Sequence, residues 1–472
     1  MKAPLLETLL TYHNEKNLIL SMPGNKCGLG FQVDSLGREF MNKMGRMDIT
    51  EVDPLDNLHC PEGVIDEAQK LLAKTYKSKK AYFLVNGSSG GNLSAVFACF
   101  NEGDEVIVER NCHKSIYNAI ILRKLKVSYI EPVIDYENGI FMPPDRGNIY
   151  KAFNRCSNPK GIILTYPNYF GIVYDVEEVI DDLKARGLKV ILDCAHGAHF
   201  ELDKRLPKSM ADKGDYVVLS AHKTLPALTQ GSYVIVNDDN SEFEFYLRMF
   251  MTTSPSYLIM ASLDYARYYM DTYGQEDYEK LIDTAERWKK KINKIKNIKV
   301  LSQNDIKKFG KYDIDKSRYL IVLSKGYSGH KLLDYFRKKK IQSEMSFSQG
   351  VVLILSPFNT EEDFKKIYDA LLELNFEKIR CKDDSIYYTG SAEKVLEPYE
   401  AFKLPYEMLD INKCEGKISK EFIIPYPPGI PLVCPGEKIS REVLRVINEY
   451  INNGKDILGV FKEDRKLKIV IK

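Results

Sequence analysis

Short apolar runs alternate with segments of helical periodicity between about residues 60 and 240. The runs are rich in β-branched and aromatic residues, and they lie at 81–85, 105–108, 127–130, 161–165, 188–193, 216–220 and 232–236. Continuous apolar strands are typical of parallel sheets that are buried on both faces, and parallel neighbours need a crossover connection, which is usually a helix. The pattern therefore predicts an α/β fold with a mainly parallel central sheet between two layers of helices.

The chain has 472 residues, which is enough for more than one hydrophobic core. A second, shorter set of strand and helix patterns at about 319–374 predicts a smaller α/β domain. After about residue 385 the pattern is irregular, with a proline-rich stretch at 425–431 and an amphipathic helix at about 441–452. We expect four parts: an N-terminal arm (1–60), a large domain (61–280), a small α/β domain (281–385) and a C-terminal segment (386–472).

Charge and cysteine content narrow the class of protein. The 68 Lys and Arg residues nearly balance the 66 Asp and Glu residues, so the overall charge indicates neither a nucleic-acid partner nor an acidic membrane surface. No apolar run approaches the length of a membrane span, and the N-terminus lacks the apolar core of a signal peptide. The nine cysteines form no CxxC pair and no metal-like Cys/His spacing. We expect a cytoplasmic protein with reduced thiols and without a metal, a membrane contact or a nucleic acid.

Two residues of opposite charge follow predicted strands. Asp193 ends the run 188–193, and Ser220-Ala221-His222-Lys223 follows the run 216–219. Ligands of such sheets bind at the carboxyl ends of the strands. A lysine there can form an imine with the aldehyde of pyridoxal 5'-phosphate (PLP), and a carboxylate can keep its pyridine nitrogen protonated. The pattern predicts a PLP site with Lys223 and Asp193 as catalytic residues, Ser220 at the phosphate and His222 in proton transfer; alone, it is equally typical of a strand-end lysine facing solvent.

A turn rich in glycine and serine, Asn86-Gly87-Ser88-Ser89-Gly90-Gly91-Asn92, lies between a predicted strand and a predicted helix. Glycines let the backbone approach an anion, and hydroxyls add donors at the positive end of a helix. Neither a P-loop nor a dinucleotide fingerprint is present, because no Gly-Lys-[Ser/Thr] follows and the G-x-G-x-x-G spacing is absent. The turn predicts a phosphate cradle of Gly87, Ser88 and Ser89, although an ordinary capped turn has the same composition.

Three further segments carry candidate residues. His113 follows a predicted strand, where its ring could stack on a cofactor; an exposed His after a capped turn is the alternative. His196 fits a role beside Asp193, and its segment lacks the second carboxylate and the open ligand pattern of a metal site. Thr253 lies in a Thr-Thr-Ser-Pro segment, which N-capping of the next helix also explains.

Together with Met22-Pro23-Gly24, Leu55–His59 and Tyr426–Glu437, these segments resemble the Orn/Lys/Arg decarboxylase family, and the similarity runs over almost the whole chain. The resemblance implies a PLP-dependent transferase-like (fold type I) large domain, a smaller C-terminal α/β domain and an obligate homodimer with shared active sites, with further assembly left open. It implies these roles: Lys223 as Schiff-base lysine, Asp193 at the pyridine nitrogen with His196 beside it, His113 stacked on the ring, Gly87, Ser88, Ser89 and Ser220 at the phosphate, His222 near the substrate, and Thr253 at the phosphate of the neighbouring subunit's cofactor.

The chain departs from the family pattern at three positions. Asn25 stands where the family usually has the His of Pro-Gly-His-Lys-Gly-Gly, Cys194 replaces a common Glu after the cofactor Asp, and Phe347 replaces an Asp that often follows Glu-Met-Ser. A basic substrate needs an acidic partner, for which Glu344 and Glu437 are candidates by their motif positions. Either acid is also typical of a structural cap or a surface position. The departures bear on substrate identity rather than on the cofactor machinery.

The resemblance implies PLP-dependent decarboxylation of a basic L-amino acid in polyamine metabolism. Arginine, which gives agmatine, is favoured because compact bacterial members often act on it, while lysine (giving cadaverine) and ornithine (giving putrescine) stay open. An aminotransferase or a carbon–carbon lyase would use the same Asp and Lys, and Arg318 or Arg380 could then bind an α-carboxylate. A non-catalytic, PLP-binding regulatory homologue is the third alternative, against which the presence of Lys223, Asp193 and His113 argues.

Overall fold

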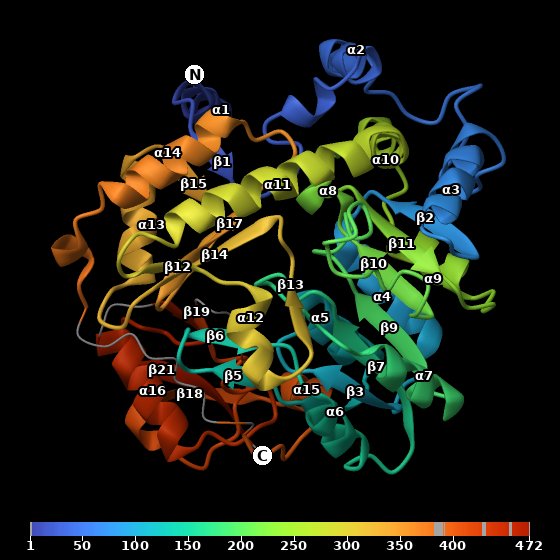
Figure 1. Cartoon of the computed structure of the whole chain (residues 1–472). Coiled ribbons are helices and arrows are strands. Elements are labelled where there is room, and N and C mark those ends of the chain that lie inside the picture. Colours follow the sequence, from blue (N-terminus) through green and yellow to red (C-terminus); the bar gives the residue numbers. More distant parts are fainter. Residues whose placement is uncertain (1, 382–389, 391, 427–430, 453–455, 472) are drawn as a thin grey trace.

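A seven-stranded sheet forms the centre of the large domain (Figure 1). The computed structural model describes residues 2–381, 390, 392–426, 431–452 and 456–471. The sheet order is β2 (Lys80–Leu84), β11 (Ser232–Val236), β10 (Tyr216–Leu219), β9 (Lys189–Asp193), β7 (Pro159–Thr165), β3 (Glu105–Glu109) and β4 (Lys126–Ile130). Neighbouring strands are parallel except at β11, which runs antiparallel to β10 and to β2. The predicted, mainly parallel α/β sheet is confirmed.

Helices cover both faces of this sheet, because successive strand residues point to opposite sides. One face, which includes Ile107, packs against α3 (Val64–Thr75), α6 (Arg146–Phe153), α7 (Glu177–Ala185) and α10 (Tyr257–Tyr269). The other face, which includes Val106 and Val108, packs against α4 (Gly87–Cys99), α5 (Lys114–Arg123) and α9 (Phe243–Met249). With both faces covered, a small molecule can reach the strands only at their ends.

A smaller antiparallel sheet forms the second domain. Its order is β12 (Ile298–Val300), β14 (Arg318–Leu323), β17 (Gly350–Ile354) and β16 (Met345–Phe347). Three helices complete its core: α11 (Gln275–Ile292), α13 (Gly329–Lys338) and α14 (Glu361–Leu372). The N-terminal strand β1 (Leu18–Leu20) pairs in parallel with β15 (Ile341–Ser343), and its leucines join the same core. Part of the predicted N-terminal arm is therefore packed into the small domain.

The C-terminal segment is more regular than its sequence pattern indicates. β18 (Tyr406–Asp410) pairs with β21 (Lys466–Val470), β19 (Ile424–Tyr426) pairs with β20 (Asp456–Leu458), and α16 (Arg441–Asn452) packs into a core of this segment's own. The expectation of irregular structure after residue 385 is wrong here, because the strands are short and their partners lie far along the chain. Within the predicted proline-rich stretch, residues 427–430 lie outside the described residues.

This segment also covers one edge of the central sheet. Glu397, just before α15 (Pro398–Lys403), accepts a hydrogen bond from the backbone N of Val127 in β4 at 3.1 Å. Nζ of Lys394 donates to the carbonyl oxygen of Val127 at 2.6 Å. Open edge strands can pair with other chains, and these side chains bind the backbone groups that would do so.

Within the described ranges, no helix has both the length and the apolar character that crossing a membrane requires.

We expect Gly161→Ala to destabilise the fold, because Gly161 lies in β7 between two other strands. A Cβ at this position would lie 2.5 Å from the carbonyl oxygen of Lys189 and 2.5 Å from the ring of Phe100. The free energy of unfolding should fall by about 1–3 kcal/mol, the usual cost of overpacking, as measured by denaturant titration with circular dichroism. Gly45→Ala is the matched control, since a Cβ there meets nothing within 4 Å; equal losses in the two variants would contradict this account.

Candidate active site

The predicted catalytic residues meet at the carboxyl ends of the parallel strands. Asp193 is the last residue of β9, and Lys223 lies on the short helix α8 (Ala221–Thr224), which follows β10. Because β9 and β10 are parallel neighbours, the two residues share one edge of the sheet. The turn after β2 brings Ser88, in the first turn of α4, to the same edge.

Three serine hydroxyls meet at the N-terminus of α4. Oγ of Ser88 lies 2.6 Å from Oγ of Ser220 and 3.1 Å from Oγ of Ser232. Gly87 precedes them with φ of 74°, a conformation that favours glycine, and Ser89 is exposed beside them. Hydroxyl donors at the positive end of a helix fit a phosphate group. Ser232 was missed by sequence reasoning, because it begins the antiparallel β11 and reaches this edge only through strand pairing.

Asp193 is buried, and each of its carboxylate oxygens accepts a separate N–H group. Nδ2 of Asn92 donates to Oδ2 at 3.0 Å, and the backbone N of Ala195 donates to Oδ1 at 3.1 Å. Nδ2 of Asn92 also donates to Oγ of Ser115 at 2.9 Å, and this oxygen lies 2.8 Å from Nδ1 of His113. Both donors to Asp193 are neutral, so they orient the carboxylate without neutralising it. Its charge stays available for a protonated ring nitrogen.

His113 caps α5 and lies at the same edge. Its Nδ1 accepts a hydrogen bond from the backbone N of Ser115 at 3.2 Å, so the proton of the neutral ring is on Nε2. Burial lowers the pKa of His113, the charge of Asp193 opposes this, and the charge of Lys223 adds to it. A neutral imidazole of this kind is suited to stack on a cofactor ring.

A chain of side chains leads from Lys223 into the small domain. Nζ of Lys223 lies 3.1 Å from Nε2 of His196, and Nδ1 of His196 lies 3.0 Å from Nη2 of Arg318. A guanidinium can only donate, so Nδ1 of His196 accepts and Nε2 carries the proton of the neutral ring. Nε2–H then donates to Nζ of Lys223, which requires a neutral amine. We call Asp193, His196, Lys223 and Arg318 the Lys223 cluster.

The electrostatics of the Lys223 cluster agree with this proton arrangement. Burial lowers the pKa of Lys223; the charges of Asp193 and Glu344 oppose the shift, and that of Arg318 adds to it. Burial also lowers the pKa of His196 well below its ordinary value; a positive charge on Lys223 would lower it further, as does that of Arg318. A free amine is the form of lysine that attacks an aldehyde carbon.

Arg318 is held in place on three sides. Its Nε donates to Oδ2 of Asp315 at 3.2 Å, its Nη1 donates to the carbonyl oxygen of Tyr169 at 2.7 Å, and its Nη2 contacts His196. Asp315 also lies 3.1 Å from Nε2 of His199. Burial by itself would raise the pKa of Asp315, but His199 and Arg318 hold it below its ordinary value. This buried ion pair fixes the guanidinium that orients His196.

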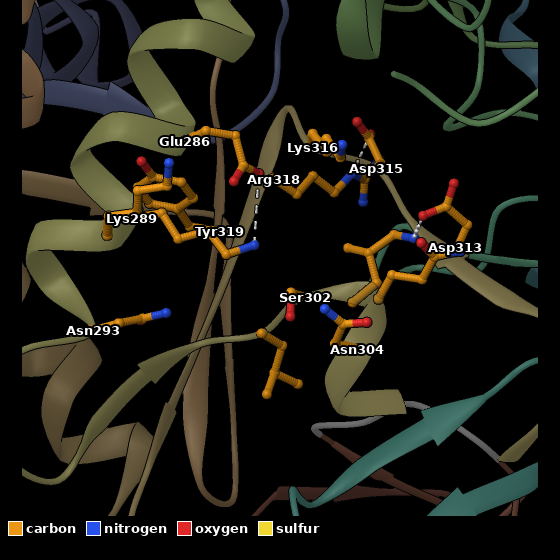
Figure 2. A pocket seen from close by; sticks show the side chains of 14 residues that line it. Glu286, Lys289, Asn293, Ser302, Asn304, Asp313, Asp315, Lys316, Arg318 and Tyr319 are labelled. Carbon is orange, nitrogen blue, oxygen red and sulfur yellow. Dashed lines mark hydrogen bonds and ion pairs between the residues drawn. The ribbon is translucent and has the colours of Figure 1, made fainter. Parts of the chain in front are cut away.

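Arg318 and Asp315 also line a cavity of about 350 Å³ between α11 and the β13 (Tyr312–Ile314) to β14 connection (Figure 2). Glu286 and Lys289 of α11 face it, with Ser302 on the opposite wall. None of the residues predicted to bind PLP lines this cavity. Arg318 is the member of the Lys223 cluster that reaches it.

Glu344, one of the two predicted substrate acids, faces the Lys223 cluster from the small domain. Its Oε1 accepts from the hydroxyl of Tyr169 at 2.6 Å, and its Oε2 accepts from the backbone N of Met22 at 2.9 Å. The Tyr169 ring lies 4.9 Å from the ring of His196, measured between centroids. Sequence reasoning missed Tyr169, because it lies in a loop and belongs to none of the motifs. Glu344 and Tyr169 thus form an acidic, hydrogen-bonded wall beside Lys223.

Glu437, the other predicted substrate acid, belongs to a separate, buried ion pair. Its two oxygens accept from Nη1 and Nη2 of Arg110 at 2.7 and 2.8 Å, and Oε2 also accepts from the backbone N of Cys434 at 2.7 Å. Arg110 begins the turn that leads to His113, so the ion pair anchors this turn to the C-terminal segment. The described contacts place Glu437 with Arg110 and do not bring it to Lys223. Its substrate role stays a prediction.

His222 is fixed by a backbone contact, whereas Thr253 is exposed to solvent. Nδ1 of His222 lies 2.9 Å from the carbonyl oxygen of Gly231, which can only accept, so Nδ1 carries the proton and Nε2 keeps a lone pair. Burial lowers the pKa of His222. Thr253 is exposed, in a segment that reaches the cradle through Asn86, whose Oδ1 accepts from the backbone N of Thr252 at 3.4 Å. The described contacts do not join Thr253 to the three serine hydroxyls of its own subunit.

Comparison with known proteins identifies the family. The chain matches "Orn/Lys/Arg decarboxylase, major domain" over residues 3–319 and "Orn/Lys/Arg decarboxylase, C-terminal domain" over residues 384–461. The chain belongs to the Orn/Lys/Arg decarboxylase family. Two Bacillus subtilis (strain 168) proteins are similar over nearly their whole length: "Uncharacterized protein YaaO" is 32% identical (100% of this chain, 98% of that protein), and "Arginine decarboxylase" is 29% identical (99% and 97%).

The structure also resembles the constitutive lysine decarboxylase of E. coli. The TM-score is 0.79 at 19% identity, and the match covers 100% of this chain and 82% of the other. This likeness confirms the predicted fold type I architecture. Members of the Orn/Lys/Arg decarboxylase family are PLP-dependent carboxy-lyases, and this chain is an enzyme of that class.

The three departures from the family pattern have structural explanations. Nδ2 of Asn25 donates to the carbonyl oxygen of Ala227 at 2.8 Å and so ties the N-terminal loop to the segment after α8. Phe347 is buried and packs edge-to-face on Phe170, with ring centroids 5.5 Å apart. Cys194 is buried beside Asp193, and burial raises the pKa of its thiol well above the ordinary value.

We expect Glu437→Gln to destabilise the protein, because it removes the negative charge that Glu437 places against the buried guanidinium of Arg110. The free energy of unfolding should fall by about 3–5 kcal/mol, the usual effect of breaking a buried ion pair from one side. The double variant Arg110→Met/Glu437→Leu removes both charges and should recover part of the loss. Denaturant unfolding measures both effects. A single variant as stable as the native protein would show that the pair does not anchor the His113 turn.

Proposed function

We propose that this protein decarboxylates a basic L-amino acid with PLP as cofactor, in polyamine metabolism. Arginine, giving agmatine, is favoured over lysine and ornithine, which would give cadaverine and putrescine. The observation that carries the proposal is the contact of 3.1 Å between Nζ of Lys223 and Nε2 of His196, at the edge where Asp193 also lies. Family membership supports the reaction class, and the similarity to a protein named arginine decarboxylase supports the favoured substrate.

The residues at this edge fit PLP. They offer a hydroxyl cluster at a helix N-terminus, a buried carboxylate held only by neutral donors, and a neutral amine. Each would hold one part of the cofactor: Ser88, Ser89, Ser220 and Ser232, with the backbone at Gly87, the phosphate; Asp193 the pyridine nitrogen; Lys223 the aldehyde carbon; and His113 one face of the ring. When bound, PLP accepts the electron pair of the bond between Cα and the carboxyl group.

Lys223 and His222 would handle the protons. Nζ of Lys223 is neutral, so it can act as a nucleophile without first losing a proton. Nε2 of His222 is left free by the contact of Nδ1 with Gly231, and it can carry a proton to Cα after CO₂ has left. Asp193, oriented by Asn92, stabilises positive charge at the pyridine nitrogen throughout the reaction.

Glu344 would bind the basic side chain of the substrate. Tyr169 and the backbone of Met22 orient its carboxylate, and each oxygen keeps a lone pair for a further donor. A guanidinium can donate two parallel hydrogen bonds to one carboxylate, whereas an ammonium acts as a point charge. A fixed carboxylate of this kind favours arginine.

The contacts of the candidate arginines argue against an aminotransferase, which would need a guanidinium for the α-carboxylate. Arg318 already donates to Asp315, to the Tyr169 carbonyl and to His196. Arg380 is exposed and lies 3.2 Å from Glu377. A non-catalytic homologue would hold PLP with the same lysine and carboxylate, so an assay separates it from an enzyme.

A competition assay tests the proposal. Purified protein is incubated with PLP and equimolar L-arginine, L-lysine and L-ornithine, and the products are identified by mass spectrometry. We expect agmatine to dominate, and we expect Lys223→Ala to reduce amine formation to below about one thousandth while keeping its circular dichroism spectrum. A keto acid as product would favour the aminotransferase, and bound PLP without any amine would favour the non-catalytic homologue. Normal turnover by Lys223→Ala would refute the role of this lysine.

We also propose a cytoplasmic homodimer with shared active sites. The nine cysteines are all free thiols, as is typical of a reducing compartment. The helix α1 (Pro4–Asn14) contributes no buried residue to its own subunit, and its leucines Leu5, Leu6, Leu9 and Leu10 are 56% to 74% exposed. An apolar helix face of this size is typical of an interaction surface. In such a dimer, the exposed Thr253 would complete the phosphate site of the partner subunit.

Negative charges introduced on the apolar face of α1 should separate the subunits of the proposed dimer. We expect Leu6→Glu/Leu9→Glu to raise the dimer dissociation constant at least about tenfold, because two apolar side chains leave the interface. Analytical ultracentrifugation measures the change, and Leu372→Glu at the end of α14 is the control, since Leu372 is similarly exposed (60%) on another helix. A native protein that sediments as a monomer at micromolar concentration would rule out the dimer.

A further inference from the structure

Glu109 is a buried carboxyl group for which the reaction outlined above has no use. It is the last residue of β3, it is 0% exposed, and it lies at the same end of the sheet as Asp193. β7 runs between β3 and β9, and Thr165 at the end of β7 pairs with Asp193 in the strand register. Oε2 of Glu109 accepts from the backbone N of Thr165 at 2.7 Å. Its Oε1 is buried and has no hydrogen-bond partner among the described residues.

The surroundings of Glu109 disfavour a negative charge. The titratable groups that interact with it come from four elements of the fold: Asp193, Cys112, Tyr174 and Tyr312. None of these four carries a positive charge. Arg110, the next residue in the chain, directs its guanidinium toward Glu437. In the part of the chain that the structure describes, Glu109 forms no ion pair.

A charge on Asp193 makes a second negative charge on the buried Glu109 less favourable. Asp193 accepts two N–H groups, from Asn92 and Ala195, which stabilise its charged form. Glu109 accepts one. Burial raises the pKa of Glu109 to about 8; the bond from Thr165 opposes the shift, and the charge of Asp193 adds to it. The proton therefore belongs on Glu109, and the negative charge on Asp193.

We propose that Glu109 is a positioning residue, held as a neutral carboxylic acid, so that of the two carboxyl groups at the ends of β3 and β9 only Asp193 carries negative charge. Its carbonyl oxygen, Oε2, fixes the backbone of Thr165, and Thr165 pairs with Asp193. The protonation state of Glu109 is a property of the protein without cofactor. Its consequence for PLP rests on the proposed function, in which Asp193 pairs with the pyridine nitrogen. Ionising Glu109 would place a second negative charge beside that pair.

Infrared spectroscopy of the protein without PLP tests the protonation state directly. At pH 7 the native protein should show a carboxylic acid C=O band that Glu109→Gln lacks, and in the native protein this band should disappear with a midpoint near pH 8. Glu105→Gln, at the other end of β3, is the matched control, since Glu105 also accepts a backbone N–H, from Asn158 at 2.6 Å, and this variant should keep the band. No such band in the native protein, or a band that persists in Glu109→Gln, overturns the proposal. The titration of the native protein decides the question even if the variant fails to fold.

The pH dependence of stability gives an independent readout. The pKa of Glu109 is about 8 in the folded protein and 4.5 as an ordinary Glu. Between these values the folded state holds a proton that unfolding releases, so the free energy of unfolding falls as the pH rises from about 4.5 to about 8. Glutamine cannot titrate, so this fall should be smaller in Glu109→Gln and unchanged in Glu105→Gln. An identical pH dependence in Glu109→Gln and the native protein would contradict a neutral Glu109.

Measuring PLP retention in Glu109 variants separates this inference from the proposed reaction. Glu109→Ala leaves the Thr165 N–H without its partner and should weaken PLP retention about tenfold, as the loss of a supporting contact commonly does. Glu109→Gln is neutral and keeps an acceptor oxygen, so it should restore most of the retention. If Gln were as poor as Ala, the site would need a carboxylate and the proposal would fail. A native protein that binds PLP but forms no amine would refute the decarboxylase and leave the infrared result standing.

Discussion

The organisation of the site depends on one property of parallel strands, which is that their carboxyl ends lie at the same edge of the sheet. β9 and β10 bring Asp193 and Lys223 together, although 30 residues separate them in the sequence. β3 and β7 bring Glu109 and Thr165 to the same edge. The antiparallel β11 contributes its first residue instead of its last, which is why Ser232 joins the hydroxyl cluster. The residues predicted to act in catalysis, in support and in phosphate binding thus share one boundary between the covered sheet faces and solvent.

Burial at this boundary decides which groups carry charge. Arg318 and Asp315 stay ionised because they face each other, and their fixed geometry makes Nδ1 of His196 an acceptor. The same burial lowers the pKa of Lys223 and raises that of Glu109. Burial thus favours the neutral form of both Lys223 and Glu109. The polar groups do not act independently, since a changed charge on one of them changes the proton position on the next.

The local pattern of the sequence predicts the strand ends well and the supporting contacts poorly. Asp193 and Lys223 could be found because a single apolar run precedes each of them, and the glycine-rich turn marks the cradle in the same way. The supporting contacts of the site are tertiary contacts between distant segments, which local periodicity cannot predict. They involve Tyr169, Arg318 and Asn92. The C-terminal strands were missed for the same reason, because β18 and β21 lie 56 residues apart between Asp410 and Lys466. The motif position of Glu437 could not reveal that Arg110 occupies both of its oxygens.

The segments 169–170 and 344–347 connect the core with substrate choice. Phe170 packs on Phe347 in the core, while the hydroxyl of the adjacent Tyr169 donates a hydrogen bond to Glu344 at the site. A carboxylate at position 347 would meet the Phe170 ring rather than a hydrogen-bond donor, so the aromatic pair replaces the second acid of the family pattern. Under the proposed function, Glu344 would be the acidic partner of the substrate. A single oriented carboxylate distinguishes substrates by hydrogen-bond geometry more than by charge, because a planar guanidinium matches both of its oxygens and an ammonium does not. The aromatic pair of Phe170 and Phe347 therefore supports the proposal that the substrate is arginine.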